Sequence, residues 1–246
     1  MKKLLLVGAS LFAIAAAGGA SAADLPVYTK APKAVPYNWT GFYLGVEGGA
    51  GWGNAEQSDP NGFKSGDFTP NGAFVGGTIG YNWQVGPNWV LGLEGDASWA
   101  DISATTPGTN QALTNHNSIT GCGGLIQHCE TKLEGIETVR ARAGYAFGYV
   151  MPYITGGLAV GQLFGSEGDV AANGAFGSGS TTVVGWTVGT GVEAMILPRW
   201  TVKLEGLYTD FGSTRVFNDT IVGKSVPESI KFTPSFIKIG VNYKIF

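Results

Sequence analysis

The stretch Thr138-Val139-Arg140-Ala141-Arg142-Ala143-Gly144-Tyr145 carries apolar and charged side chains in strict alternation. Successive side chains of a β-strand point to opposite faces, so Val139 and the two alanines share one face and the arginines share the other. This period of two is typical of a strand and does not fit a helix. The stretch therefore predicts a strand that separates an apolar environment from a charged one.

The same alternation recurs through the rest of the chain and predicts eight strands. They are expected at 40–54, 73–85, 89–102, 131–147, 152–164, 181–196, 200–211 and 231–246. Three connections are tight, at 86–88, 148–151 and 197–199, and they alternate with four long ones, at 55–72, 103–130, 165–180 and 212–230. Bacterial outer-membrane barrels combine an even strand number with short periplasmic turns and long outer loops. The pattern predicts an all-β fold, an eight-stranded antiparallel up-and-down transmembrane β-barrel over 39–246, with four long extracellular loops.

A soluble barrel would bury the apolar face, so two further features favour the membrane. Aromatic residues gather at the strand ends in two bands, as in interfacial girdles. Near the tight turns these are Tyr81, Trp83, Trp89, Tyr145, Phe147, Tyr153, Trp200 and Tyr243; near the long loops they are Trp52, Trp99, Phe164, Tyr208 and Phe211. The apolar positions between the bands are uninterrupted by charge: Leu44, Val46, Leu91, Leu93, Val139, Ala141, Ala143, Val184, Val188, Val192, Val202, Leu204, Ile237, Ile239 and Val241.

The opposite phase of the strands predicts a charged barrel interior. It holds Glu47, Glu94, Asp96, Arg140, Arg142, Glu193, Lys203, Glu205, Lys238 and Lys244, five acidic and five basic residues. Because an eight-stranded barrel is only wide enough for side chains to fill it, these charges are expected to form a ladder of ion pairs that plugs the interior. The alternative is a narrow pore with Arg140 and Arg142 as its filter.

Both cysteines and both histidines fall in the expected loop 103–130. In an oxidising compartment a Cys122–Cys129 disulfide is expected, because this spacing does not match the closely paired ligands of a zinc site. His116 and His128 remain weak haem or metal candidates, and no cofactor is expected. No nucleophile and base are paired near a strand end, which argues against an enzyme.

The N-terminus predicts export. Lys2 and Lys3 precede the apolar stretch 4–17 and the small residues Ala20-Ser21-Ala22, so residues 1–22 read as a signal peptide. The prolines of 23–38 predict an extended periplasmic linker. The whole chain has 15 Lys+Arg against 18 Asp+Glu, a formal net charge of −3, so it lacks the basic excess that nucleic-acid binding requires.

Several motifs resemble the RopB-type outer-membrane proteins of alphaproteobacteria, the outer-membrane β-barrel domain family. They are Asn38-Trp39-Thr40-Gly41-Phe42-Tyr43-Leu44-Gly45, Gly80-Tyr81-Asn82-Trp83, Leu93-Glu94-Gly95-Asp96, Ala141-Arg142-Ala143-Gly144-Tyr145 and Gly240-Val241-Asn242-Tyr243-Lys244. The resemblance spans nearly the whole chain. It implies an eight-stranded barrel with an envelope or surface-antigen role, and in some members haem binding or small-solute passage. It transfers no binding residue.

The expected function is therefore a non-enzymatic envelope-structural protein and surface antigen of the Gram-negative outer membrane. A narrow porin, or a haem or metal receptor acting through 103–130, is the alternative. Expected partners are outer-membrane lipid, lipopolysaccharide and the barrel-assembly machinery, which reads the C-terminal strand. The ending Tyr243-Lys244-Ile245-Phe246 has one residue more than the family pattern, which puts Phe246 in the interior phase and Ile245 in the lipid phase.

Overall fold

The computed structural model describes residues 37–58, 69–106, 127–169, 174–221 and 224–245. Nine strands occupy these ranges. They are β1 (Gly41–Ser58), β2 (Asn71–Val85), β3 (Trp89–Thr106), β4 (Gln127–Tyr145), β5 (Val150–Asp169), β6 (Gly174–Leu197), β7 (Trp200–Asp210), β8 (Ser213–Ile221) and β9 (Lys224–Lys244). The described residues contain no helix that is both long and apolar enough to cross a membrane.

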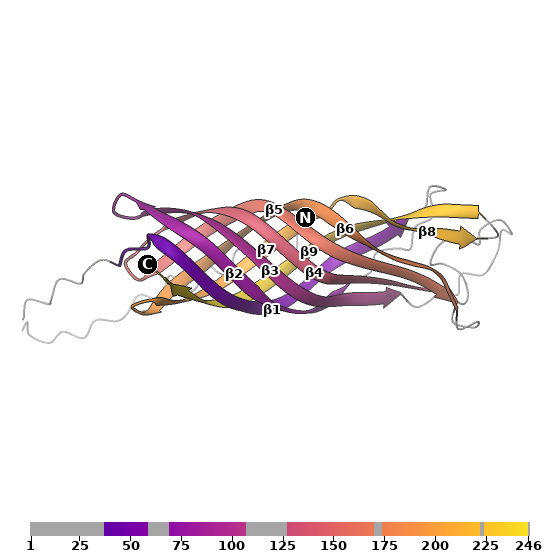
Figure 1. Ribbon diagram of the computed structural model, residues 1–246, viewed down its shortest axis with the longest axis horizontal. Coiled ribbons are helices and arrows are strands. Elements are labelled where there is room, and N and C mark those ends of the chain that lie inside the picture. Colours follow the sequence, from indigo (N-terminus) through magenta and orange to yellow (C-terminus); the bar gives the residue numbers. More distant parts are fainter. Residues whose placement is uncertain (1–36, 59–68, 107–126, 170–173, 222–223, 246) are drawn as a thin grey trace, which may run out of the picture. The chain divides into compact units, whose positions relative to one another are not determined.

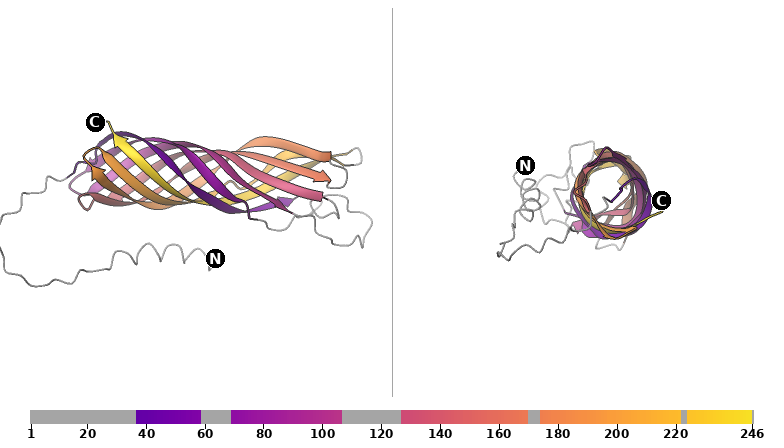
Figure 2. Two further views of the ribbon diagram at one scale, coloured as in Figure 1. Left: turned by 90° about the horizontal axis from the view of Figure 1, so that it is seen from below. Right: turned by 90° about the vertical axis from the view of Figure 1, so that its left-hand side faces the viewer.

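The strands form one antiparallel sheet that closes on itself. From β1 to β7 each strand pairs with the next, β7 pairs with β9, and β9 returns to pair with β1. Eight strands, β1–β7 and β9, therefore form the wall, which the end-on view shows as a ring (Figures 1 and 2). The predicted all-β, eight-stranded up-and-down architecture is confirmed.

Tight turns join the strands at one end of the barrel. The β2–β3 and β4–β5 turns contain Gly86 and Gly148, whose φ angles of 77° and 66° lie in the left-handed region that glycine enters without a steric cost. The described C-terminus lies at this end too, because the Lys244 backbone N–H donates to the Arg199 carbonyl. Ile245 lies beside it and donates its N–H to Phe42; Phe246 is outside the described residues.

At the other end the strands extend further than their sequence predicted. β5 runs to Asp169 and β6 starts at Gly174, so most of the expected loop 165–180 is strand. The expected loop 212–230 contains β8, which forms a hairpin with β9 beyond the ring. These segments are polar and glycine-rich, so their composition predicts loops, but cross-strand hydrogen bonding continues where a neighbouring strand is available.

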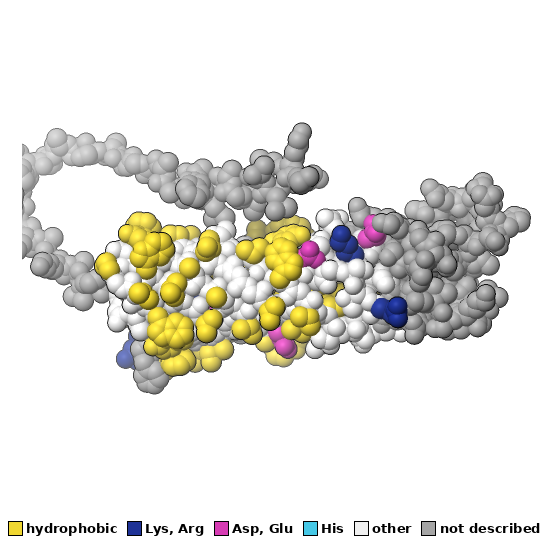
Figure 3. All heavy atoms as spheres, turned by 90° about the horizontal axis from the view of Figure 1, so that it is seen from above, with side chains coloured by type: hydrophobic (Ala, Val, Ile, Leu, Met, Phe, Trp, Pro, Cys, Tyr) yellow, Lys and Arg dark blue, Asp and Glu magenta, His cyan; other side chains and the backbone are white. Residues whose placement is uncertain are grey.

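The two faces of the wall differ as the alternation predicted. Val139 is 67% exposed whereas its neighbour Arg140 is 0% exposed. The outward apolar side chains cover part of the wall, and charged side chains appear beyond them toward the loop end (Figure 3). Two aromatic residues were assigned wrongly to the outer bands. Tyr153 and Phe211 are buried inside the barrel, because Tyr153 lies in the interior phase of β5 and Phe211, directly after β7, continues the interior phase of that strand.

The interior is layered along the barrel axis. On the loop side lies an apolar cluster: Ala55, Phe74, Ala100, Ile102, Leu133, Ile136, Ala159, Leu163, Val183, Leu207, Phe211, Ile230, Phe232 and Phe236. Near the tight turns lies a second cluster: Trp39, Val90, Ala146, Met151 and Tyr153. Along β4 the order is Leu133, Ile136, Arg140, Arg142 and then the turn, so the charged residues lie between the two clusters.

A charge placed on the apolar belt should destabilise the barrel. Ile154 on β5 is 66% exposed on the outward face. We expect Ile154→Arg to lower the free energy of unfolding by about 2–4 kcal/mol, since a cation there enters hydrocarbon. Urea unfolding of the protein refolded in lipid vesicles measures this. Thr105→Arg is the control, because Thr105 is an exposed residue of β3 on the loop side of Trp99, beyond the apolar belt. Equal losses of stability in both variants would contradict a lipid-facing belt.

Candidate functional site in the barrel interior

Strand register places opposite charges next to one another inside the wall. Glu94 on β3 lies opposite Arg140 on β4, and Glu205 on β7 lies opposite Lys238 on β9. Glu193 on β6 likewise faces Lys203 on β7. Nine of the ten charged residues expected in the interior are buried: Glu47, Glu94, Asp96, Arg140, Arg142, Glu193, Lys203, Glu205 and Lys238. We refer to these nine residues as the interior charge network.

Arg140 is the centre of the network. Its Nη2 lies 2.7 Å from Glu94 Oε1 and 2.8 Å from Asp96 Oδ2, and its Nη1 lies 2.7 Å from Glu205 Oε1. One guanidinium thus joins three carboxylates from β3 and β7. Arginine suits this position because its planar group presents several donors in fixed directions and keeps its charge when buried.

Arg142 extends the network toward the tight turns. Its Nη1 lies 3.3 Å from Glu94 Oε2, and its Nη2 forms an ion pair with Glu193. The guanidinium carbon lies 4.1 Å from the centroid of the Tyr153 ring, close enough for a cation–π contact. The cation is therefore held by carboxylates at its edge and by an aromatic ring at its face.

The two lysines link the remaining carboxylates. Lys203 Nζ lies 2.9 Å from Glu47 Oε2 and 3.2 Å from Glu94 Oε1. Lys238 Nζ lies 3.0 Å from Glu47 Oε1 and 3.3 Å from Glu205 Oε1. Glu47 on β1 thus meets Lys238 on β9, 191 residues away in the sequence, across the seam where the sheet closes.

Uncharged residues that the sequence analysis did not assign to the interior complete the network. The hydroxyls of Tyr43 and Tyr153 donate to Glu94 and Glu205, each at 2.8 Å, and Thr138 donates to Asp96 at 2.7 Å. The glycines opposite the tyrosines were the available signal. A Cβ on Gly80 would lie 2.3 Å from the Tyr43 hydroxyl, and one on Gly191 would lie 2.6 Å from the Tyr153 hydroxyl. Glycine at these positions makes room for a ring in the interior.

Lys244 does not belong to the network, although alternation assigns it to the interior. It lies where β9 ends and is partly exposed; its Nζ is 5.2 Å from the centroid of the Tyr37 ring and donates to the Asn38 carbonyl. The expected balance of five acids and five bases is thus wrong. Among the described residues, five buried carboxylates face four buried cations.

Aromatic side chains close both sides of the network. On the turn side the Trp39 indole N–H donates to the Gly148 carbonyl at 3.2 Å, and the Tyr37 ring packs edge-on against Trp39. Burial, and then the charge of Glu193, raise the pKa of Tyr37. On the loop side the rings of Phe74 and Phe236 meet edge to face, 5.7 Å apart. The charges are therefore enclosed by apolar layers rather than open to a vestibule.

The loop residues expected to carry other chemistry are only partly described. His116 and Cys122 lie outside the described residues. His128 and Cys129 belong to the start of β4 rather than to a loop, because that stretch pairs with β5, and their side chains are not described. Among the described residues, no group of three or more His, Cys, Asp or Glu is arranged to hold a metal ion.

Removing the central cation should destabilise the barrel strongly. We expect Arg140→Met to cost about 3–5 kcal/mol in urea unfolding, because three buried carboxylates each lose one of their cationic partners and the interior gains a net negative charge. Arg199→Met, at an exposed turn position, is the control and should change stability by less than about 0.5 kcal/mol. Adding Glu205→Gln to Arg140→Met should cost less than the two single changes summed, because one uncompensated charge is removed. Additive losses would contradict direct coupling.

Comparison with known proteins places this barrel in a family. The family model described as "Outer membrane protein beta-barrel domain" matches residues 10–244. The 31 kDa outer-membrane immunogenic protein of Brucella melitensis is 36% identical over 265 residues, covering 99% of this chain and 100% of the relative. The 25 kDa outer-membrane immunogenic protein of Brucella abortus is 31% identical over 249 residues, covering 99% and 98%.

Solved structures agree on the fold. The crystal structure of the outer membrane protease OmpT from Escherichia coli matches with a TM-score of 0.54 and 10% identity, covering 87% of this chain and 99% of that one. At this identity the likeness concerns the fold alone. The family match spans all nine strands described above. The chain therefore belongs to the outer membrane protein β-barrel domain family, and it resides in the cell outer membrane.

Proposed function

We propose that this protein is a sealed structural barrel of the outer membrane that presents its loop end at the cell surface as an antigen. The observation that carries the proposal is the filled interior. Nine buried charged side chains cross-link the wall, and an apolar cluster lies on each side of them. An ion crossing the barrel would have to disrupt buried ion pairs that are held in place by packed aromatic rings.

The strands beyond the apolar belt support the antigen role. The β8–β9 hairpin and the loop-side ends of β5 and β6 project beyond the ring toward the loop end (Figure 1). The exposed side chains described there include Ser178, Ser180, Ser213 and Arg215. The curated relatives from Brucella are named immunogenic, a property that we carry over to this chain as part of the proposal. The proposal contains no catalytic step, because each carboxylate of the network is engaged by a cation.

Two other functions remain as hypotheses. A narrow porin would use Arg140 and Arg142 as its filter, but both guanidiniums are tied to carboxylates on neighbouring strands, which favours the sealed barrel. A haem or metal receptor would act through His116 and His128 of 103–130. Loss of binding in the His116/His128 double substitution would support that receptor, and absence of binding by the unmodified protein would contradict it.

The sealed interior predicts that the barrel does not conduct ions. We expect the refolded mature protein to give no reproducible conductance steps in a planar bilayer, with heat-modifiable gel mobility showing that the barrel has folded. A known porin inserted under the same conditions is the positive control. Reproducible steps that change in Arg140→Ala would overturn the sealed barrel in favour of the porin.

The proposed orientation predicts where an epitope tag is accessible. A tag inserted after Asn110 should bind antibody on intact cells. The same tag inserted after Pro87, in the tight β2–β3 turn, should bind only after the outer membrane is permeabilised. Equal labelling of both insertions on intact cells, or the reverse order, would contradict surface presentation of the loop end.

A further inference from the structure

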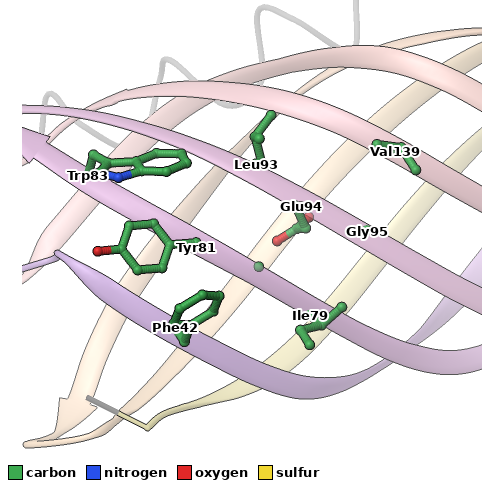
Figure 4. Close-up of a pocket in the computed structure, with 9 residues that line it drawn as sticks. Phe42, Ile79, Tyr81, Trp83, Leu93, Glu94, Gly95 and Val139 are labelled. Carbon is green, nitrogen blue, oxygen red and sulfur yellow. The ribbon is translucent and has the colours of Figure 1, made fainter.

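A groove runs along the outer wall over strands β1 to β4. It is a shallow hollow, open on its outward side, with a volume of about 560 Å³. The rings of Phe42, Tyr81 and Trp83 lie in a row on one side, with Leu93 and Val139 on the other (Figure 4). The groove opens on the outward face of the wall. Glu94 borders it, but the Glu94 carboxylate points into the barrel, where it pairs with Arg140, so no charged group faces the groove.

Glycine in the outward phase creates the hollow. Register aligns Ile79, Gly95 and Val139 across β2, β3 and β4, so Gly95 leaves a gap between two branched side chains. The next outward row, Tyr81 and Leu93, continues the gap toward the tight turns. A Cβ at Gly95 would meet only the Thr138 carbonyl, at 3.7 Å, so the backbone does not need glycine there for space. The hollow is therefore a property of the outer surface, not of barrel packing.

The turn-side end of the groove offers polar groups. The rings of Tyr81 and Trp83 are in contact, with centroids 4.5 Å apart and planes inclined by 58°, and Trp83 is followed closely by the β2–β3 turn. Neither the Tyr81 hydroxyl nor the Trp83 indole N–H has a hydrogen-bond partner among the described residues. Such amphipathic rings belong at the headgroup level, where one end is apolar and the other hydrated.

We infer that this groove binds one acyl chain of a phospholipid from the periplasmic leaflet. The groove is continuous with the apolar belt that faces the bilayer, so an amphiphile of the membrane reaches it without leaving the lipid phase. Its apolar lining suits a hydrocarbon chain, and its polar end, near the tight turns, suits the ester and phosphate oxygens of a headgroup. The choice of leaflet rests on the proposed orientation, in which the tight turns lie on the periplasmic side; this selects phospholipid rather than lipopolysaccharide.

Two glycine substitutions separate this site from the rest of the wall. Gly95→Leu fills the hollow, whereas Gly206→Leu adds the same side chain to the outward face of β7, on the other side of the barrel. A Cβ at Gly206 would meet nothing within 4 Å, so both positions have room for a side chain. Heat-modifiable mobility and urea unfolding establish that each variant folds before lipid binding is compared.

The test uses a phospholipid that carries a photoreactive diazirine on one acyl chain. The full mature barrel is refolded into vesicles containing this probe, irradiated, digested and mapped by mass spectrometry. We expect several-fold more adducts on the peptides containing Ile79, Leu93 and Val139 than on those containing Val192 and Leu204, which lie outward on β6 and β7 in the opposite wall. Gly95→Leu should reduce that excess to the level of the opposite wall, and Gly206→Leu should leave it unchanged.

Two results would overturn the inference. Adducts spread evenly around the wall of the unmodified protein would mean ordinary annular lipid with no site. Protein–protein cross-links through the same peptides, with few lipid adducts, would mean that a second copy of the chain covers the groove. Neither result would affect the sealed interior, which conductance measures separately.

Discussion

The hydrogen bonding between β9 and β1 is the constraint on which the rest of the structure depends. In a bilayer no water is available for an open sheet edge, and each unpaired backbone group costs several kcal/mol. The pairing runs from Tyr43 opposite Lys244 to Ser58 opposite Ser229, so it covers all of β1 except its first two residues. Closure removes both edges at once and creates the enclosed space in which charged side chains can be buried.

Closure also decides how the buried charges are compensated. An ionised side chain is costly in an apolar interior unless a partner of opposite charge and hydrogen-bond donors surround it. Arg140 meets three carboxylates, and the hydroxyls of Tyr43, Tyr153 and Thr138 complete the carboxylate shells. If any one strand slipped by one residue, its interior side chains would point outward into the lipid. The network therefore strongly favours a single register. We regard it as a structural cross-link of the wall.

The same alternation also determines the outer surface, because outward-facing residues alternate with inward-facing ones along every strand. Because the interior phase contains the charges, the outward phase is left with aliphatic side chains bounded by aromatic ones. Glycines in that phase do not form part of the charge network, and at Gly95 the missing side chain hollows the wall between Ile79 and Val139. One rule of strand geometry therefore accounts for the filled interior, the apolar belt and the groove.

Much of this architecture was predictable from the sequence. The period of two identified the strands around Arg140 and Arg142, their two faces and all nine residues of the network, because the direction of a side chain on a strand is set locally. The alternation of tight and long connections gave the order of the strands. Strand ends were less predictable: polar segments such as 213–221 look like loops, and become strands because a neighbour supplies hydrogen bonds.

The partners of each charge were decided only by the tertiary structure. Glu47 meets Lys238 across 191 residues, and no local pattern encodes that pairing. The inward turn of Tyr153 and Phe211, the exclusion of Lys244 and the apolar layer on each side of the network likewise depend on register and on where the barrel ends. The sequence by itself determined which face each side chain takes, whereas closure of the sheet determined what it meets there, because contacts across a barrel join residues that are distant in the chain.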